Sequence, residues 1–343
     1  MSYAKKYSEK SKDALRRAAS ANKEIREDAQ QALAQALTVP LRKAIFDRDS
    51  LGEIFVKEVL EPGGQANYPL DFIKPGYEDE FVAFTLPKQG RIPERHVEGD
   101  ELWVQTFRVG NTIDWDISYA ENARFNVIER CIRAYEDGYI RKNNSDGWRT
   151  ILAAADGRGL IVSATGAAPF TGATVVPTAA AGQFTKELVS RMKTAMMRGA
   201  GGNGPYAGRL TDLYLSPEAM EDIRAWDADE VDEFTRRQIF VNEEYGLASI
   251  YGVTLHEMTE FGIGQEYQNF LTNVTRTSFP GSEVEWCVGL DLSTKDSFLM
   301  PIRRELETLD DPTLYRQMRM GIYGWMEHGF AALDPRRVIL GCF

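Results

Sequence analysis

The residues best equipped for chemistry lie in one short motif, His256-Glu257-Met258-Thr259-Glu260. It begins like the zinc-protease signature His-Glu-x-x-His, in which two histidines one helical turn apart hold the metal. Glu260 occupies the second ligand position, and the preceding Val253-Thr-Leu255 favours a strand rather than a helix. The motif is therefore typical of a polar strand end, and the sequence predicts no metal site and no cofactor.

The other chemically capable residues form no catalytic arrangement either. Only His96, His256 and His328 are available for acid–base work, and none stands beside a serine or cysteine in a nucleophile motif. The Gly199–Pro205 loop lacks the Gly-Lys-Ser/Thr ending of a phosphate-binding loop, and Gly262-Ile-Gly264 has no βαβ frame around it. We therefore expect no catalytic residues and predict that the chain is not an enzyme.

The composition is that of a globular protein. A chain of 343 residues is expected to form two packed domains, or one domain with long projecting segments. No apolar run approaches the ~20 residues that span a membrane, so no membrane partner is expected. Cys131, Cys287 and Cys342 are odd in number and far apart, which suits reduced thiols in a cytoplasmic setting.

Charge is unevenly spread along the chain. The net charge of −11 argues against a protein that coats nucleic acid over its whole surface. Residues 1–23 carry seven basic against two acidic residues, a net +5, which leaves −16 for the rest. Such an arm suits either local contact with nucleic acid or, more commonly, a solvated amphipathic helix. Its basic residues are Lys5, Lys6, Lys10, Lys12, Arg16, Arg17 and Lys23.

The element that organises the chain is a long helix predicted over Ala120–Ala155. Phe125, Ile128, Ile132, Tyr135 and Tyr139 are spaced 3, 4, 3, 4 and form one apolar stripe, which resumes at Trp148, Ile151, Leu152 and Ala155. The alternative is two ordinary helices broken near Asn143–Gly147, a stretch rich in helix breakers. In both cases the segment is a strut and not a site.

Two elements that precede this helix have little to pack against. Residues 4–37, rich in Ala, Lys, Glu and Gln, predict a helix that ends before Pro40 and buries so little that it needs a partner, which we expect to be another subunit. Residues 61–110, punctuated by Pro and Gly, predict a two-stranded excursion through Phe81–Leu86 and Leu102–Val109, which is not stable alone.

The remaining chain mixes helices and strands into an α+β body. Helices are predicted over Gln183–Arg198, from Ser216-Pro217-Glu218 onwards and over Asp227–Val241. Strands are predicted at Leu213–Leu215, Ile250–Leu255 with a turn at Gly252, Val284–Leu292, Phe298–Leu306, Met318–Met326 and Val338–Leu340. Late strands that pack against an early long helix make a fold of high contact order.

This order of elements resembles that of the major capsid protein of tailed bacteriophages, the Hong Kong 97-type capsid fold. The amino-acid sequences of two stretches agree with the resemblance. Leu213-Tyr-Leu-Ser-Pro-Glu-Ala-Met220 looks like the strand and helix of the family's axial domain. Tyr323-Gly-Trp-Met-Glu-His-Gly-Phe-Ala-Ala-Leu-Asp-Pro-Arg-Arg-Val-Ile-Leu-Gly341 looks like the closing strand and tail of its peripheral domain.

The resemblance implies a domain organisation. It assigns residues 1–40 to an N-terminal helix, 41–62 to the N-arm, 63–110 to the extended loop (a β-hairpin), 111–156 and 275–343 to the peripheral domain with its spine helix, and 157–274 to the axial domain. The charged tip of the extended loop is then expected to make contacts between subunits. Its residues are Lys88, Arg91, Glu94, Arg95, Glu98, Asp100 and Glu101.

The same resemblance implies a function. Such a protein self-assembles as hexamers and pentamers into the icosahedral shell around a double-stranded DNA genome, in the host cytoplasm, and ends in the virion capsid. Its expected partners are itself, a portal protein at one vertex, scaffolding and decoration proteins, and packaged DNA held by weak non-specific contacts. Only about 40 residues precede the N-arm, which favours a separate scaffolding protein or none.

Two alternatives stay open at this point. One is an encapsulin-like nanocompartment shell, which has the same fold but encloses an enzyme cargo. The other, weaker alternative is a metal-dependent hydrolase of another fold that uses His256 and Glu257.

Overall fold

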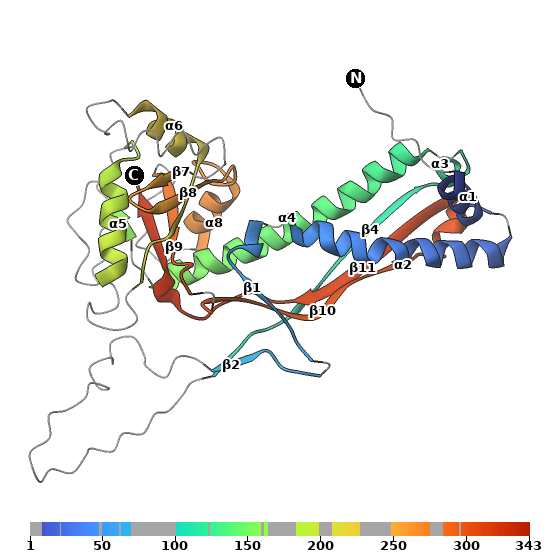
Figure 1. Ribbon diagram of the computed structural model, residues 1–343, viewed down its shortest axis with the longest axis horizontal. Helices are drawn as coiled ribbons and strands as arrows, with labels where there is room; N and C mark the ends of the chain where they lie inside the picture. Colours follow the sequence, from blue (N-terminus) through green and yellow to red (C-terminus); the bar gives the residue numbers. More distant parts are fainter. Residues whose placement is uncertain are drawn as a thin grey trace, which may run out of the picture. The chain divides into compact units, whose positions relative to one another are not determined.

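A computed structural model describes most of the chain in two compact units. The described residues are 9–20, 22–47, 50–61, 63–69, 101–122, 124–158, 161–163, 183–198, 208–226, 248–274, 284–294 and 296–343. Unit 1 comprises Met1–Ala66, Trp103–Gly147 and Leu299–Phe330, and unit 2 comprises Asn67–Leu102, Trp148–Phe298 and Ala331–Phe343. Figure 1 shows the elements of both units, with labels for most of the helices and many of the strands. The strand predicted at Phe81–Leu86 and the helix predicted at Asp227–Val241 lie outside the described residues.

Unit 1 is built on a sheet of long strands in the order β1-β10-β11-β4. Strand β1 (Val56–Val59) runs parallel to β10 (Phe298–Asp310), and β11 (Arg319–His328) runs antiparallel to both β10 and β4 (Phe107–Asp116). The β11–β4 ladder is continuous over ten residue pairs. On one face of this ladder, Met320 and Ile322 lie opposite Trp115 and Ile113 and form the core of the unit. The predicted strands at 298–306 and 318–326 are confirmed.

The long helix is present as α4 (Phe125–Arg158), preceded by the short helix α3 (Ile117–Glu121). It is one helix of 34 residues, so the predicted strut is confirmed and the alternative of two helices is wrong. Gly147 does not break it because the side chain of Leu51 fills the space beside that glycine, where any Cβ would collide with it. Packing at this point outweighs the weak helix propensity of glycine.

A pair of tyrosines fastens α4 to the sheet of unit 1. The Tyr139 hydroxyl donates to the carbonyl oxygen of Gly324 on β11 and accepts the Asn111 N–H of β4 at 2.9 Å. The Tyr135 hydroxyl donates to the Tyr139 hydroxyl at 3.4 Å. Burial raises the pKa of both hydroxyl groups, which therefore stay protonated. The apolar stripe of the helix thus carries the polar contacts that fix its register on the sheet.

The N-terminal segment forms two helices, α1 (Glu9–Ala18) and α2 (Lys23–Asp47), followed by a 3-10 turn η1 (Ser50–Gly52). The prediction of one helix that ends before Pro40 is wrong, because α2 continues through this proline. Thr308 of β10 donates to the Ala34 carbonyl oxygen at 2.8 Å, and Arg42 donates to the Leu306 carbonyl oxygen at 3.0 Å. Contacts to β10 before and after Pro40 hold the helix in place despite the missing N–H.

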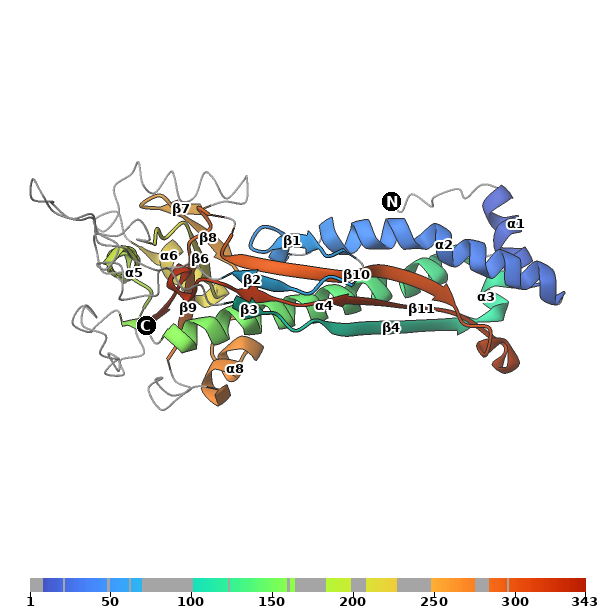
Figure 2. The same cartoon turned by 90° about the horizontal axis from the view of Figure 1, so that it is seen from below.

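The expectation that this segment finds cover only on another subunit is also corrected. The Gln30 side chain donates to the Ala18 carbonyl oxygen at 3.1 Å, and Ala18 and Ala34 are both buried. Leu41 and Ile45 enter the core of unit 1. Helix α2 follows β10 in Figures 1 and 2. One face of α2 is therefore covered by its own chain.

Unit 2 is built on a six-stranded sheet in the order β5-β13-β9-β6-β8-β7. Its strands are β5 (Ile161–Ser163), β6 (Asp212–Leu215), β7 (Ala248–Ile250), β8 (Val253–Glu257), β9 (Trp286–Leu290) and β13 (Val338–Cys342). Helices α5 (Lys186–Arg198), α6 (Pro217–Ala225) and α8 (Glu266–Val274) belong to the same unit. Every residue of β9 and β13 is buried, so both faces of these central strands are covered.

Local signals placed several elements of unit 2 correctly. Ser216 caps α6, and its hydroxyl accepts the Ala219 N–H at 3.0 Å, as the Ser-Pro-Glu sequence predicted. Strands β7 and β8 form a hairpin around Tyr251 and Gly252, whose φ angles of 51° and 74° suit the tight two-residue turn that favours glycine. The turn predicted at Gly252 is confirmed.

The strand pairing divides the last part of the chain between the two units. Residues 275–343 were expected to lie wholly in one domain with the long helix. Strands β10 and β11 do pair in unit 1, but β9 and β13 pair with each other and with β6 in unit 2. The last turns of α4, from Trp148 on, are also assigned to unit 2. The order of elements along the sequence does not predict this division between the two units, because the division depends on which distant strands pair.

Short elements complete the described chain. Strands β2 (Asn67–Pro69) and β3 (Glu101–Trp103) pair with each other, and β4 begins only at Phe107. The segment predicted as one strand over Leu102–Val109 is therefore interrupted. The last short elements are η4 (Leu314–Gln317), β12 (Ala331–Ala332) and η5 (Pro335–Arg337).

Candidate functional site

The His256–Glu260 motif lies on strand β8 and at its end, as the sequence predicted. His256 Nε2 is 2.9 Å from Asp212 Oδ1, and the ring stacks on Tyr214 with 4.6 Å between ring centroids. Glu257 pairs instead with Arg224 at 3.7 Å. Successive residues of a strand point to opposite faces, so the two side chains do not converge on one ligand. Among the described residues, no group of three His, Cys, Asp or Glu side chains is placed to hold a metal ion.

The other histidine that the structure describes, His328, is buried in unit 1. Its ring lies 5.3 Å from the rings of both Phe107 and Phe330, and neither ring nitrogen has a hydrogen-bond partner among the described residues. Burial lowers the pKa of His328 to about 4, while Asp146 raises it and Lys142 lowers it by smaller amounts. A neutral, enclosed imidazole of this kind is a packing residue. His96 lies outside the described residues.

The basic arm is only partly described. Lys10 and Lys12 lie on α1, and Lys5 and Lys6 lie outside the described residues. Arg16 pairs with Asp13 at 3.8 Å and Lys23 with Glu27 at 3.8 Å, all four on the surface. Exposed pairs of this kind contribute little to stability, so these side chains keep their charge available to a partner.

Of the predicted contact residues in the loop tip, the structure describes only Glu101, at the start of β3. Its carboxylate accepts a hydrogen bond from Asn67 Nδ2 of β2 at 2.5 Å. The neighbouring Trp103 is 70% exposed. The other six residues (Lys88, Arg91, Glu94, Arg95, Glu98 and Asp100) lie outside the described residues, so their role stays a prediction.

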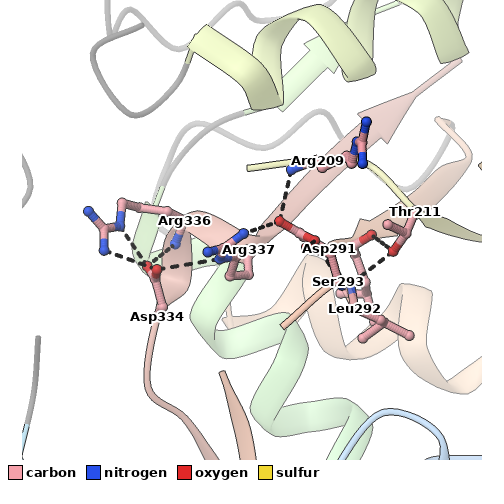
Figure 3. Close-up of polar contacts among 9 residues, drawn as sticks. Arg209, Thr211, Asp291, Leu292, Ser293, Asp334, Arg336 and Arg337 are labelled. Atoms are coloured by element: carbon pink, nitrogen blue, oxygen red, sulfur yellow. Dashed lines mark hydrogen bonds and ion pairs between the residues drawn. The ribbon is translucent and has the colours of Figure 1, made fainter. Parts of the chain in front are cut away.

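The best-built polar site lies in unit 2, where the Asp-Pro-Arg-Arg sequence meets the end of β9 (Figure 3). Asp334 caps η5 by accepting the Arg336 N–H at 3.0 Å, and it accepts further hydrogen bonds from the Arg336 side chain at 2.8 and 3.0 Å. Arg337 donates to Asp291, which follows β9 directly. Two arginines of one turn thus point toward two carboxylates.

Asp291 is the centre of this site. Its side chain is fully buried, and it accepts hydrogen bonds from the Arg209 N–H at 2.8 Å, the Ser293 N–H at 3.0 Å and the Ser293 hydroxyl at 2.5 Å. Burial by itself raises the pKa of this carboxyl, but these hydrogen bonds and the one from Arg337 lower it below its ordinary value. The carboxylate therefore stays charged inside the protein and clamps three segments together.

This clamp gives a physical role to one of the sequence stretches that carried the family resemblance. Asp334-Pro335-Arg336-Arg337 is a capped turn whose second arginine compensates a buried acid. The sequence analysis missed Asp291 as the partner. A signal was present, because an acid that directly follows a strongly apolar strand is buried and needs a cation.

A second, partly buried carboxyl, Glu285, supports the start of α6. Ser216 accepts the Ala219 N–H as the helix cap and donates its own hydroxyl hydrogen to Glu285. Burial raises the pKa of Glu285 to about 7, with further contributions from the neighbouring Glu218 and Asp222. The cap is thus linked to a carboxyl that changes charge near neutral pH.

The three cysteines are free thiols, as expected. Cys287 and Cys342 are fully buried on β9 and β13, and burial holds the pKa of Cys287 well above its ordinary value. No helix in the described ranges is long and apolar enough to cross a membrane.

The fold that these elements define is the Hong Kong 97-type capsid fold: a long helix on a sheet of long strands in one unit, and a six-stranded sheet with helices in the other. Neither a protein-family model nor a curated protein matches this chain.

Several solved structures share the fold at low sequence identity. The capsid of an empty GTA particle is similar with a TM-score of 0.55 and 13% identity, over 86% of this chain and 89% of that chain. A capsid structure of Helicobacter pylori bacteriophage KHP30 gives 0.54 and 8%, over 86% and 91%. The capsid asymmetric unit of cyanophage Pam1 gives 0.53 and 14%, over 82% and 85%.

The clamp at Asp291 predicts a large effect on stability. Asp291→Asn removes the closer of the two charges that compensate Arg337, whose side chain is only 11% exposed, and leaves this buried cation with only the more distant Asp334 at 3.7 Å. We expect the free energy of unfolding to fall by about 3 kcal/mol, measured by urea denaturation followed by tryptophan fluorescence. The matched control is Glu266→Gln, which removes an exposed pair with Arg149 and should cost less than about 1 kcal/mol. Equal losses in the two variants would contradict the clamp.

Glu285 predicts a pH dependence of stability. Its pKa of about 7 in the folded chain exceeds its ordinary value of 4.5, so the folded state binds the extra proton. This stabilisation is fully present below pH 4.5 and is lost as the pH rises through 7.

In the wild-type chain, Glu285 should therefore lower the free energy of unfolding by roughly 1–3 kcal/mol between pH 5 and 8. Glu285→Gln should remove this decrease. Urea midpoints measured at pH 5, 6, 7 and 8 check this. Glu257→Gln, in an exposed ion pair, serves as the control and should follow the wild-type curve. If the urea midpoints of Glu285→Gln change with pH in parallel with those of the wild type, the prediction is wrong.

Proposed function

We propose that this chain is a major capsid protein, many copies of which assemble into the icosahedral shell around the double-stranded DNA genome of a tailed bacteriophage. The observation that carries the proposal is the similarity to capsid structures over more than four fifths of both chains, with TM-scores of 0.53 to 0.55. The role is structural rather than enzymatic, since His256, Glu257 and His328 are each engaged in packing or in a pair within their own unit.

The surface of the chain supports a role as a subunit of a larger assembly. Several large apolar side chains are exposed on the isolated chain, among them Trp103, Val39 and Met318 at 70%, 69% and 65%. Contacts between copies would cover such residues. The hairpin base at β2 and β3 would carry the extended loop, residues 63–110, whose charged tip would contact a neighbouring copy in the hexamers and pentamers.

The domain assignment follows from the same proposal. Unit 1, with the tyrosine-anchored part of α4, would be the peripheral domain, and unit 2, with the six-stranded sheet, would be the axial domain. The boundary then differs from the sequence-based one in residues 275–343. Further partners would be a portal protein at one vertex, with scaffolding and decoration proteins as additional candidates.

Charge supports a division of labour at the inner surface of the shell. The −16 carried by residues 24–343 would disfavour tight binding of DNA, which has to move freely during filling and release. The +5 arm, residues 1–23, would lie on the inner surface and hold an acidic partner before DNA enters. Assembly would take place in the host cytoplasm, and the finished protein would reside in the virion capsid.

Self-assembly is the direct test of this proposal. We expect the purified 38.6 kDa chain to form closed particles of hundreds of copies, because exposed apolar surface is buried in each new contact. Light scattering and negative-stain images over a series of salt and protein concentrations measure this. A compact monomer under every condition would contradict it. Particles from the native source that contain protein cargo rather than DNA would favour a nanocompartment shell of the same fold.

A further inference from the structure

Helix α2 carries apolar residues on two opposite faces. One face, with Leu41 and Ile45, is buried in unit 1. The opposite face is exposed and also apolar, and we call it the outer stripe: Ile25, Ala32, Ala36 and Val39. Ile25 and Val39 are 47% and 69% exposed. A helix whose second apolar face is uncovered in the described chain is suited to a second partner.

Three of the four residues of the outer stripe are spaced symmetrically about Ala32, whereas the position that mirrors Ala36 is Asp28. Ile25 precedes Ala32 by seven residues and Val39 follows it by seven, which is two helical turns in each direction. At about 100° per residue, the four residues of the stripe fall within a sector of roughly 60°. Small residues occupy the middle and larger ones the two ends. This arrangement lets two helices approach closely at Ala32.

Charges of opposite sign lie near the two ends of the stripe, Glu24 eight residues before Ala32 and Lys43 eleven residues after it. Glu24 lies next to the first end of the stripe and Lys43 lies beyond the other end. Both side chains are exposed, and neither has an ion pair within the described residues. In an antiparallel pair of copies, each Glu24 comes close to Lys43 of a second copy. In a parallel pair, Lys43 would face Lys43, which is repulsive.

We infer that the outer stripe of α2 docks antiparallel on the same stripe of a second copy of this chain, about a two-fold axis at Ala32. Ile25 then packs against Val39 of the second copy, and Ala32 meets its own counterpart. The occupant is a second copy because the stripe is complementary to itself in both size and charge, as an isologous contact requires. The inference rests on the proposed self-assembly only in requiring more than one copy.

Cysteine crosslinking tests the contact directly. The experiment uses the full chain in a Cys131→Ser background, since Cys287 and Cys342 are buried. Ala32→Cys places two thiols at the two-fold axis, so mild oxidation should give disulfide-linked dimers on a non-reducing denaturing gel. The matched control is Gln31→Cys, exposed on the same helix but turned about 100° away. We expect at least five-fold more dimer for Ala32→Cys.

A second pair of variants reads the direction of the helices. Ile25→Cys and Val39→Cys chains should crosslink when they are mixed before assembly and give little dimer alone. Dimers of Ile25→Cys with itself would indicate a parallel pair and overturn the inference.

The outcomes separate this inference from the proposed function. Particles that form normally but give no Ala32→Cys dimer would overturn the α2 contact and leave the capsid proposal standing. Such particles would instead fit a different protein docked on the stripe. Dimers without particles would support the contact and count against the capsid proposal. Neither dimers nor particles would overturn both.

Discussion

The constraint on which the structure depends is the length of α4. A helix of 34 residues is far longer than the average helix in a globular protein, and its apolar stripe has to be covered along that length. In unit 1, Tyr135 and Tyr139 are covered by β4 and β11. In unit 2, Trp148 packs edge-on against Tyr214 and Phe261. Long strands and a second sheet are thus what such a helix requires from the rest of the chain.

Chemically capable side chains in this chain are used for packing and cohesion. His256 is held by Asp212, Arg337 compensates Asp291, and Ser216 links a helix cap to Glu285. Glu285 and His328 respond to pH in opposite directions. Glu285 stabilises unit 2 while protonated, whereas His328 stabilises unit 1 while neutral, so its contribution is lost as the pH falls from 6.5 toward 4. The two contributions therefore oppose each other over the same pH range.

The sequence predicted the elements whose signals are local. The 3.6-residue stripe of α4, the Ser216 cap, the turn at Gly252 and the strands at β10 and β11 all follow from hydrogen bonds or periodicity within a few residues. It failed where the outcome depends on distant partners. Pro40 is tolerated because β10 holds α2 on both sides of it. Asp291 was missed because its cation lies 46 residues later, and the sharing of residues 275–343 between two units is a choice of strand partners.

The central claim is that this fold serves as a repeating unit of a closed shell. The most direct measurement is electron cryo-microscopy of the purified chain after assembly, at a resolution that traces the backbone. The account predicts icosahedral particles in which every subunit shows α4 against β4 and β11, in both pentamers and hexamers. Well-resolved particles of only a few copies, with no closed shell and with Trp103 still open to solvent, would contradict it.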